Sequence, residues 1–143
     1  MKNLMKVWLL LLVCILPLGT ACQGKKKEAA QVSTTLFDKD LPEIKQLVDG
    51  KWELVSGKNA REFCEYENTF ITFDGDRYVW TEDGKAEPGA LNWRKADTGM
   101  GYDAYLMDVF YETNPSFPLS IKGDTLFLQD CSETGYKYTL IRK

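Results

Sequence analysis

The stretch that decides the fold is Thr69-Phe70-Ile71-Thr72-Phe73-Asp74-Gly75-Asp76-Arg77-Tyr78-Val79-Trp80-Thr81. On either side of Asp-Gly-Asp, residues of high strand propensity alternate along the chain, which is typical of half-buried strands. The Asp-Gly pair suits the left-handed backbone of a tight hairpin turn. The stretch therefore predicts two antiparallel strands, at 69–73 and 77–81, joined by a turn.

The same period of two continues outward from this hairpin, with turn residues about every ten positions. It predicts further strands at 51–56, 62–66, 90–94, 104–111, 117–121, 125–129 and 135–142. A short helix is predicted at 41–49, where Asp40 and Glu43 have the spacing of a capping box. Eight or nine short strands without intervening helices predict an all-β fold, an antiparallel sandwich or barrel.

The beginning of the chain has the composition of a targeting segment. Lys2 and Lys6 precede an apolar run at 7–18 that is short for a membrane span. Leu18-Gly19-Thr20-Ala21 before Cys22 resembles a lipobox, although Gly19 occupies the position where Leu, Val or Ile is preferred. We expect a lipoprotein signal peptide at 1–21; an ordinary secretory signal cut after Ala21 is the alternative.

The residues after Cys22 are small, polar or basic and include Lys25-Lys26-Lys27. Such a composition buries little and is typical of a linker. We therefore expect a lipidated Cys22 and a flexible tether at 22–37, followed by one domain at 38–143. The lipid would make the membrane a partner and place the protein in the cell envelope, at the outer membrane.

The domain from residue 38 onward carries 13 basic and 20 acidic residues, a net charge of −7. An acidic domain does not attract phosphate backbones, so nucleic acid is not expected as a partner. The cysteines of the exported part favour a disulfide bond between Cys64 and Cys131, and two free buried thiols are the alternative. The chain has no His, and two thiolates do not complete a zinc site, so no metal is expected.

A family resemblance enters with Gly50-Lys51-Trp52 at the first strand and Arg142 on the last. The pair resembles the G-x-W motif and closing basic residue of lipocalins, and the run from about residue 41 resembles the small lipocalin-like domains of Bacteroidota lipoproteins. The resemblance implies a small antiparallel up-and-down barrel of eight or nine strands with a short helix at its base. It also implies a barrel-closing contact in which Arg142 packs over Trp52. No second lipocalin motif is present.

Catalytic chemistry has little support in the sequence. Without His, the usual base near neutral pH is missing, and we expect no catalytic residues and no cofactor. The carboxylates Glu62, Glu65 and Glu67 cluster in the sequence and suit solvent-facing positions and turns. Asp74 and Asp76 lack the further oxygen ligands of a calcium loop and suit a hairpin turn.

Aromatic residues are the more informative set, since three Trp, seven Tyr and seven Phe follow residue 36. The residues expected to line the interior are Tyr78, Trp80, Trp93, Tyr105, Tyr136 and Tyr138. A small barrel is either filled by such side chains or holds one small ligand, and the sequence leaves both open. The function expected first is binding of a small apolar or amphipathic ligand. The alternative is a protein-interaction or inhibitor-type module with a filled core.

Overall fold

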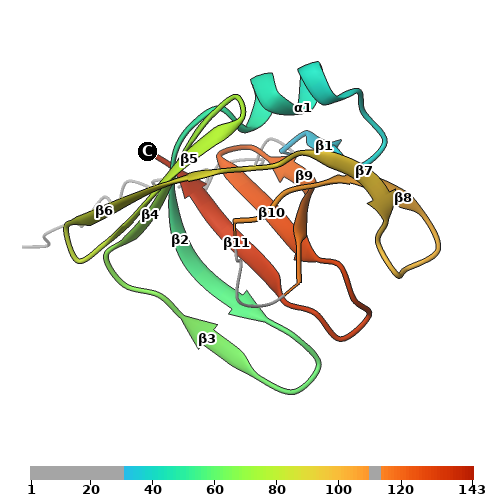
Figure 1. Ribbon diagram of the computed structural model, residues 1–143. Helices are drawn as coiled ribbons and strands as arrows, with labels where there is room; N and C mark the ends of the chain where they lie inside the picture. The colour runs from blue at the N-terminus through green and yellow to red at the C-terminus, as the bar shows by residue number, and fades with distance from the viewer. Residues whose placement is uncertain (1–30, 110–113) are drawn as a thin grey trace, which may run out of the picture.

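The computed structural model describes residues 31–109 and 114–143, which form one helix and eleven strands (Figure 1). The predicted signal peptide and Cys22 lie outside these residues. The elements are β1 (Ser33–Thr35), α1 (Leu41–Val48), β2 (Gly50–Lys58), β3 (Phe63–Glu65), β4 (Thr69–Asp74), β5 (Arg77–Glu82), β6 (Lys85–Ala90), β7 (Arg94–Asp97), β8 (Asp103–Leu106), β9 (Ser116–Lys122), β10 (Thr125–Asp130) and β11 (Lys137–Arg142). The prediction of an all-β fold is confirmed.

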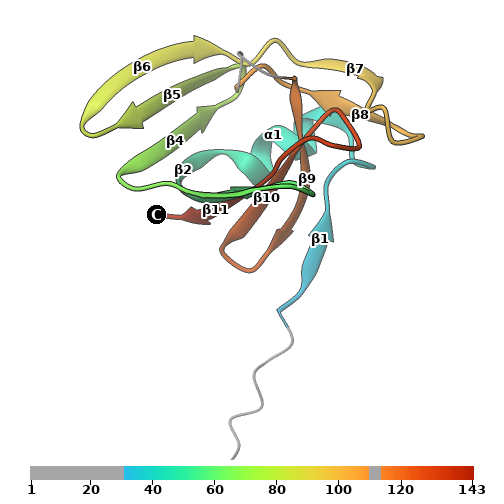
Figure 2. The ribbon, with the colours of Figure 1, turned by 90° about the horizontal axis from the view of Figure 1, so that it is seen from below.

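Nine of the strands form one antiparallel sheet in the order β1-β9-β10-β11-β2-β4-β5-β6, and β3 pairs with the second half of β2. The first and last long strands, β2 and β11, are neighbours, as an up-and-down barrel requires. Figure 2 shows the sheet curling, with β4–β6 on one side, β9–β11 on the other and α1 between them. The curled sheet has one open side, and there β7 and β8 form a separate hairpin.

Continuous strand pairing does not close this sheet within the described residues, so the fold is barrel-like. Isolated backbone hydrogen bonds cross the gap between β6 and β9. Asp108 N–H donates to the Leu91 carbonyl at 2.9 Å, and Met107 and Ser116 exchange bonds of 2.8 and 3.0 Å. Among the described residues, closure therefore depends on these few bonds of Leu91, Met107, Asp108 and Ser116, where the expected full barrel would have continuous strands.

Helix α1 covers one end of the curled sheet, as the short helix predicted at 41–49 should. Ile44 and Val48 point into the core, and Pro42 occupies the first turn, where its missing N–H costs nothing. The predicted capping box is not formed, because Asp40 makes no side-chain cap hydrogen bond. Glu43 instead forms an ion pair with Lys39.

Two strand predictions need correction. The strand expected at 90–94 is a break: β6 ends at Ala90, β7 begins at Arg94, and Leu91 between them is buried. β6 was not predicted because its residues are almost all exposed and it pairs only with β5, so it needs no apolar alternation. The strand expected at 104–111 ends at Leu106, and its residues from 110 onward lie outside the described part.

The predicted tether extends too far into the fold. Ser33–Thr35 pairs with β9, Ser33 lying opposite Lys122, and Leu36 is fully buried. A strand at the edge of a sheet needs only backbone hydrogen bonds, so a polar Ser-Thr-Thr sequence is sufficient. The folded domain therefore begins by residue 33, earlier than the expected boundary at 38.

The core lies inside the curl of the sheet. It contains fifteen buried side chains, namely Leu36, Ile44, Val48, Trp52, Leu54, Ile71, Phe73, Tyr78, Leu91, Met107, Val109, Leu126, Leu128, Tyr138 and Leu140. A second, smaller cluster of Ala104, Leu106 and Phe117 lies between the β7–β8 hairpin and β9. Tyr102 packs against Phe37 and Phe117 there, with ring centres 4.8 and 6.0 Å apart. β8 is therefore a half-buried strand, with Ala104 and Leu106 facing this cluster and Asp103 and Tyr105 on its other face.

Candidate functional site

One end of the sheet is closed by Trp52, Arg142 and α1, and we call it the helix end. The register places Arg142 opposite Trp52, and the guanidinium carbon lies 4.0 Å from the centre of the indole ring. The Arg142 guanidinium also donates to the carbonyls of Asp49 and Leu47, both at 2.9 Å. The expected contact between Trp52 and Arg142 is thus present, and it satisfies carbonyls at the C-terminus of the helix.

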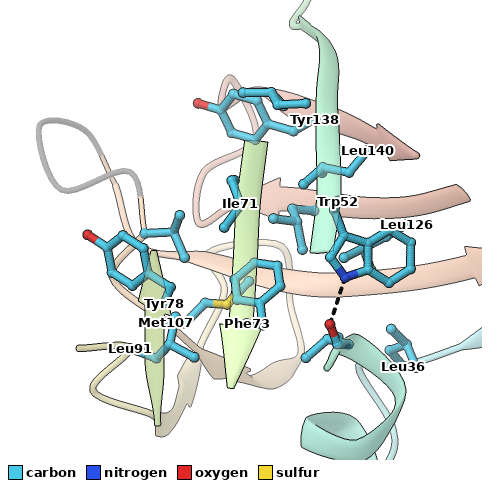
Figure 3. Close-up of a cluster of buried hydrophobic side chains, with 14 of the residues drawn as sticks. Leu36, Trp52, Ile71, Phe73, Tyr78, Leu91, Met107, Leu126, Tyr138 and Leu140 are labelled. Carbon is cyan, nitrogen blue, oxygen red and sulfur yellow. Dashed lines mark hydrogen bonds between the residues drawn. The ribbon is translucent and has the colours of Figure 1, made fainter. Parts of the chain in front are cut away.

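The indole N–H of Trp52 completes this arrangement by donating to the Val48 carbonyl at 2.7 Å (Figure 3). The side chains above the indole are just as enclosed. Those with almost no exposed surface include Leu54, Ile71, Phe73, Met107, Leu126, Leu128 and Leu140. A void large enough for water would expose part of them, so this region of the interior is packed by the protein's own side chains.

The opposite end of the sheet differs in its chemistry. Three tyrosines, Tyr66, Tyr136 and Tyr138, lie there with Glu62, Cys64 and Asp130, and we call this set the tyrosine end. Tyr136 and Tyr138 share a face of the last strand region, and their rings stack with centres 5.8 Å apart. Figure 3 shows Tyr138 and Leu36 at opposite limits of the core.

Gly57 makes room for this cluster. It lies opposite Tyr138 on β2, and a Cβ built there would stand 3.0 Å from the Tyr138 ring and 3.4 Å from the Tyr66 hydroxyl. A larger side chain would therefore displace the tyrosine rings. Gly89 plays the same part for Tyr78, whose ring would lie only 2.4 Å from an added Cβ.

Asp130 is the buried polar residue of the tyrosine end, with 1% of its surface exposed. Its carboxylate accepts a hydrogen bond from the Ser116 hydroxyl at 2.6 Å, from the Tyr136 backbone N–H at 3.1 Å and from the Tyr138 hydroxyl at 3.3 Å. Burial raises the pKa of Asp130, and these three hydrogen bonds partly oppose that rise. The charge is thus held in a low-dielectric site by dedicated donors.

The phenols at this end are also perturbed. A hydrogen bond to Glu62, followed by burial, raises the pKa of Tyr136. Burial and the Asp130 carboxylate raise the pKa of Tyr138, and burial with Cys64 and Asp130 raises that of Tyr66. Each shift favours the neutral phenol, so the tyrosine end presents hydroxyl groups next to carboxylates.

The predicted disulfide bond is contradicted, because Cys64 and Cys131 are both free thiols. Cys64 is on β3, Cys131 follows β10, and β2 and β11 lie between these strands in the sheet. Three interstrand steps of about 4.8 Å place the two near 14 Å apart, about twice the longest Cα separation a disulfide spans. Burial, followed by the Asp130 charge, raises the pKa of the Cys131 thiol to about 11.

The six aromatic residues expected to line the interior do not form one site. Tyr136 and Tyr138 are at the tyrosine end, and Tyr78 lies in the core against Gly89. The Trp93 indole donates to the Gly75 carbonyl of the β4–β5 turn at 3.0 Å. Trp80 and Tyr105 are half-buried, and Lys95 lies over the Tyr105 ring.

Sequence reasoning missed Tyr66, Asp130 and the exposed Phe63. A signal for Asp130 existed, because it continues the inward period of two set by Leu126 and Leu128. The glutamates 62, 65 and 67 are exposed, as expected of carboxylates on solvent-facing positions, and Asp74-Gly75-Asp76 forms the β4–β5 turn. In the described residues, no group of three or more acidic, Cys or His side chains has the arrangement of a metal site.

Comparison with known protein families, with curated proteins and with solved structures finds no match to this chain. Within residues 31–109 and 114–143, no helix combines the length and apolar character needed to cross a bilayer.

Proposed function

We propose that this chain is a lipid-anchored protein of the cell envelope whose barrel-like domain is a protein-interaction module with a filled core. The observation that carries this proposal is the packed interior. Trp52, Phe73 and Leu128 have essentially no exposed surface, and their neighbours are equally enclosed. Since a deep ligand cup would leave its wall side chains exposed in the empty protein, recognition belongs at the surface.

The tyrosine end is the surface that suits this role, because it lies far from the proposed anchor. The chain enters β1 from Gln31, whose side chain lies against Gly123 in the β9–β10 turn. Arg142 N–H donates to the neighbouring Asp124 carbonyl, so this turn belongs to the helix end. Eight residues lie between Cys22 and Gln31, so the two are at most about 30 Å apart along the chain. An anchor on Cys22 would hold the helix end toward the membrane.

A second candidate is binding of a small amphipathic ligand at the tyrosine end. The observation that favours it is the stack of Tyr136 on Tyr138, with Tyr136 only partly buried and neutral hydroxyls beside the carboxylates of Glu62 and Asp130. Such a surface combines an apolar ring face with hydrogen-bond donors and acceptors. The ligand would lie across the mouth of the fold, above the packed core.

Site-specific photo-crosslinking in cells that make the protein separates the two candidates. A photoreactive amino acid at Phe63 or Tyr136 should give a protein adduct of defined mass, whereas one at Asp124, at the helix end, should not. Native mass spectrometry of the mature chain carrying Cys22→Ser provides the second arm. A retained small molecule together with no protein adduct would overturn the interaction module in favour of the ligand.

Anchoring is tested separately. Metabolic labelling with a fatty acid should mark the wild-type chain and leave Cys22→Ser unlabelled and released from membranes. Equal labelling of both chains, or none of either, would contradict lipidation at Cys22.

A further inference from the structure

β3 presents an open strand edge at the tyrosine end. Tyr66 N–H donates to the Val55 carbonyl and Asn59 N–H to the Glu62 carbonyl, which fixes the hydrogen-bonded positions of the β2–β3 pair. The backbone N–H and C=O of Cys64 therefore both point toward Gly57 on β2. The N–H and C=O of Phe63 and of Glu65 point away from β2. Within the described residues β3 pairs with β2 alone, so these four groups form a free edge.

The side chains of this edge are exposed, and one is large and apolar. Phe63 has 60% of its surface exposed, which makes it one of three exposed large apolar residues among those described. Figure 1 shows β3 at the margin of the molecule, with no labelled strand on the side away from β2. An open edge next to an exposed aromatic ring is a template for an added strand.

The edge strand β6 has a sequence that protects it from further pairing. β6 contains Pro88, which lacks a backbone donor, together with the exposed charges of Lys85 and Glu87. Proline and charge on an edge strand are devices that prevent further pairing. β3 has no proline, and its charges are of one sign, Glu65 within the strand and Glu62 just before it.

Charge decides what kind of strand fits this edge. Glu62, Glu65 and Glu67 are all exposed along or beside β3, and Asp130 lies behind them. Of the nearby cations, Lys58 lies on β2 opposite Phe63, on the side away from the open edge, and Arg61 lies in the β2–β3 turn. A second copy of β3 would bring its glutamates against these, and like charges on paired strands are destabilising. A partner strand carrying Lys or Arg is attracted by these glutamates, whereas a second copy of this chain is repelled by them.

We propose that the free edge of β3 binds an extended, basic segment of a partner protein by adding it to the sheet as a further strand. This inference rests on the proposed interaction function and names the partner's chemistry. The N–H and C=O groups of Phe63 and Glu65 pair with the segment's backbone, and an apolar residue of the segment covers Phe63. A basic residue two positions along the segment, on the same face as the one that covers Phe63, lies beside Glu65.

The test uses the mature chain with Cys22→Ser and two probes. One is a strand peptide in which Val and Lys take alternate positions of one face, Thr-Val-Thr-Lys-Thr-Val-Thr-Lys, and the other is the same peptide with Glu in place of each Lys. Binding of the basic peptide should shift the amide resonances of Phe63 and Glu65 in nuclear magnetic resonance spectra and slow their hydrogen exchange. The amide of Cys64, already bonded to β2, should change least in exchange. Equal binding of the acidic peptide, or shifts confined to residues away from β3, would overturn the proposal.

Variants separate the backbone edge from the charge. Glu65→Lys should weaken binding about tenfold, whereas Glu87→Lys, the same charge reversal on the protected β6 edge, should leave it within about twofold. Phe63→Pro removes an outward amide that β2 does not use, and it should abolish binding while circular dichroism stays that of the parent. Equal weakening by both lysine variants would show that only net charge matters and would overturn strand addition.

The outcomes of the two proposals are distinguishable. If photo-crosslinks form at Tyr136 but the basic peptide does not contact β3, the interaction function stands and strand addition fails. If neither occurs, both fail.

Discussion

The two ends of the curled sheet bury polar groups in different ways. At the helix end, the Trp52 indole and the Arg142 guanidinium donate to backbone carbonyls of the helix. At the tyrosine end, the carboxyl of Asp130 is enclosed by hydroxyl donors, and the surrounding groups are titratable. The comparison teaches that one end secures the fold, whereas the stability of the other depends on protonation.

The largest effect is expected at the helix end. Trp52→Ala removes a fully buried indole from between α1 and the strands, and should lower the free energy of unfolding by about 3–5 kcal/mol through lost burial and a residual cavity. Urea denaturation checks this value. A loss below that of an exposed substitution such as Val32→Ala would show that the helix end does not secure the fold.

At the tyrosine end, Asp130→Ala should cost about 2–3 kcal/mol near neutral pH, because the Ser116 hydroxyl and the Tyr136 N–H lose a buried acceptor. Chemical denaturation measures the loss, and Glu133→Ala, an exposed acid in the same connection, is the matched control. A loss no greater than that of the control would show that the Asp130 carboxylate does not stabilise the tyrosine end.

The pH dependence of Asp130 sharpens the contrast. Because its folded pKa is raised, the native state holds a proton that the unfolded state has lost in the interval above the ordinary pKa of 3.8. The stability contributed by this group is therefore complete below that value and falls as pH rises through the folded pKa. Denaturation curves at several pH values should show this slope in the wild type and lack it in Asp130→Asn.

Arg142→Ala should cost about 1–2 kcal/mol through lost stacking on Trp52 and two lost bonds to helix carbonyls. The double variant with Trp52→Ala should lose less than the sum, since the two side chains share a contact. A double-mutant cycle measures the coupling. Strict additivity would mean that the stack contributes nothing to stability.

Alkaline titration should distinguish the tyrosines without a large change in stability near neutral pH. Tyr66, Tyr136 and Tyr138 have pKa values raised above 10, so the native state keeps protons that the unfolded chain releases, and stability falls as pH rises past 10. Tyrosinate absorbance should rise at higher pH in the native protein than in urea. Coincident titration curves would contradict the burial and hydrogen bonding of these phenols.

The smallest effect is expected from reduction. Since Cys64 and Cys131 are free thiols, a reductant should leave the midpoint of unfolding unchanged. Both thiols should be alkylated once the protein is unfolded without reductant. A bonded pair recovered by non-reducing peptide mapping would require rearranging the strands between them.

Several features of the fold could be predicted from local patterns. Alternation and turn residues located most strands, and the Asp-Gly turn at residues 74–76 forms the hairpin they indicate. The contact between Trp52 and Arg142 was predicted through family resemblance, and the register of β2 with β11 produces it. β1 and β6 escaped prediction, because edge strands are held by backbone hydrogen bonds and need no apolar period.

The candidate site was less accessible to such reasoning. Cysteine counting suggested a bond that sheet order forbids. The six aromatic residues expected around the interior all belong to the main core or pack against it, but they do not meet in one site. The edge of β3 is open because of how the neighbouring strands pair. β4 and β5 pair with each other and not with β3, so Phe63 is left uncovered.

By itself, the sequence determined the secondary structure along most of the chain, because strand period, turn residues and helix signals act over a few neighbouring residues. The tertiary structure decided which strands lie side by side, that the interior is packed, and that Asp130 is buried among hydroxyl groups. These outcomes depend on residues far apart in sequence, such as Ser116 with Asp130 and Gly57 with Tyr138. Their positions follow from the order of the strands, which local patterns do not encode.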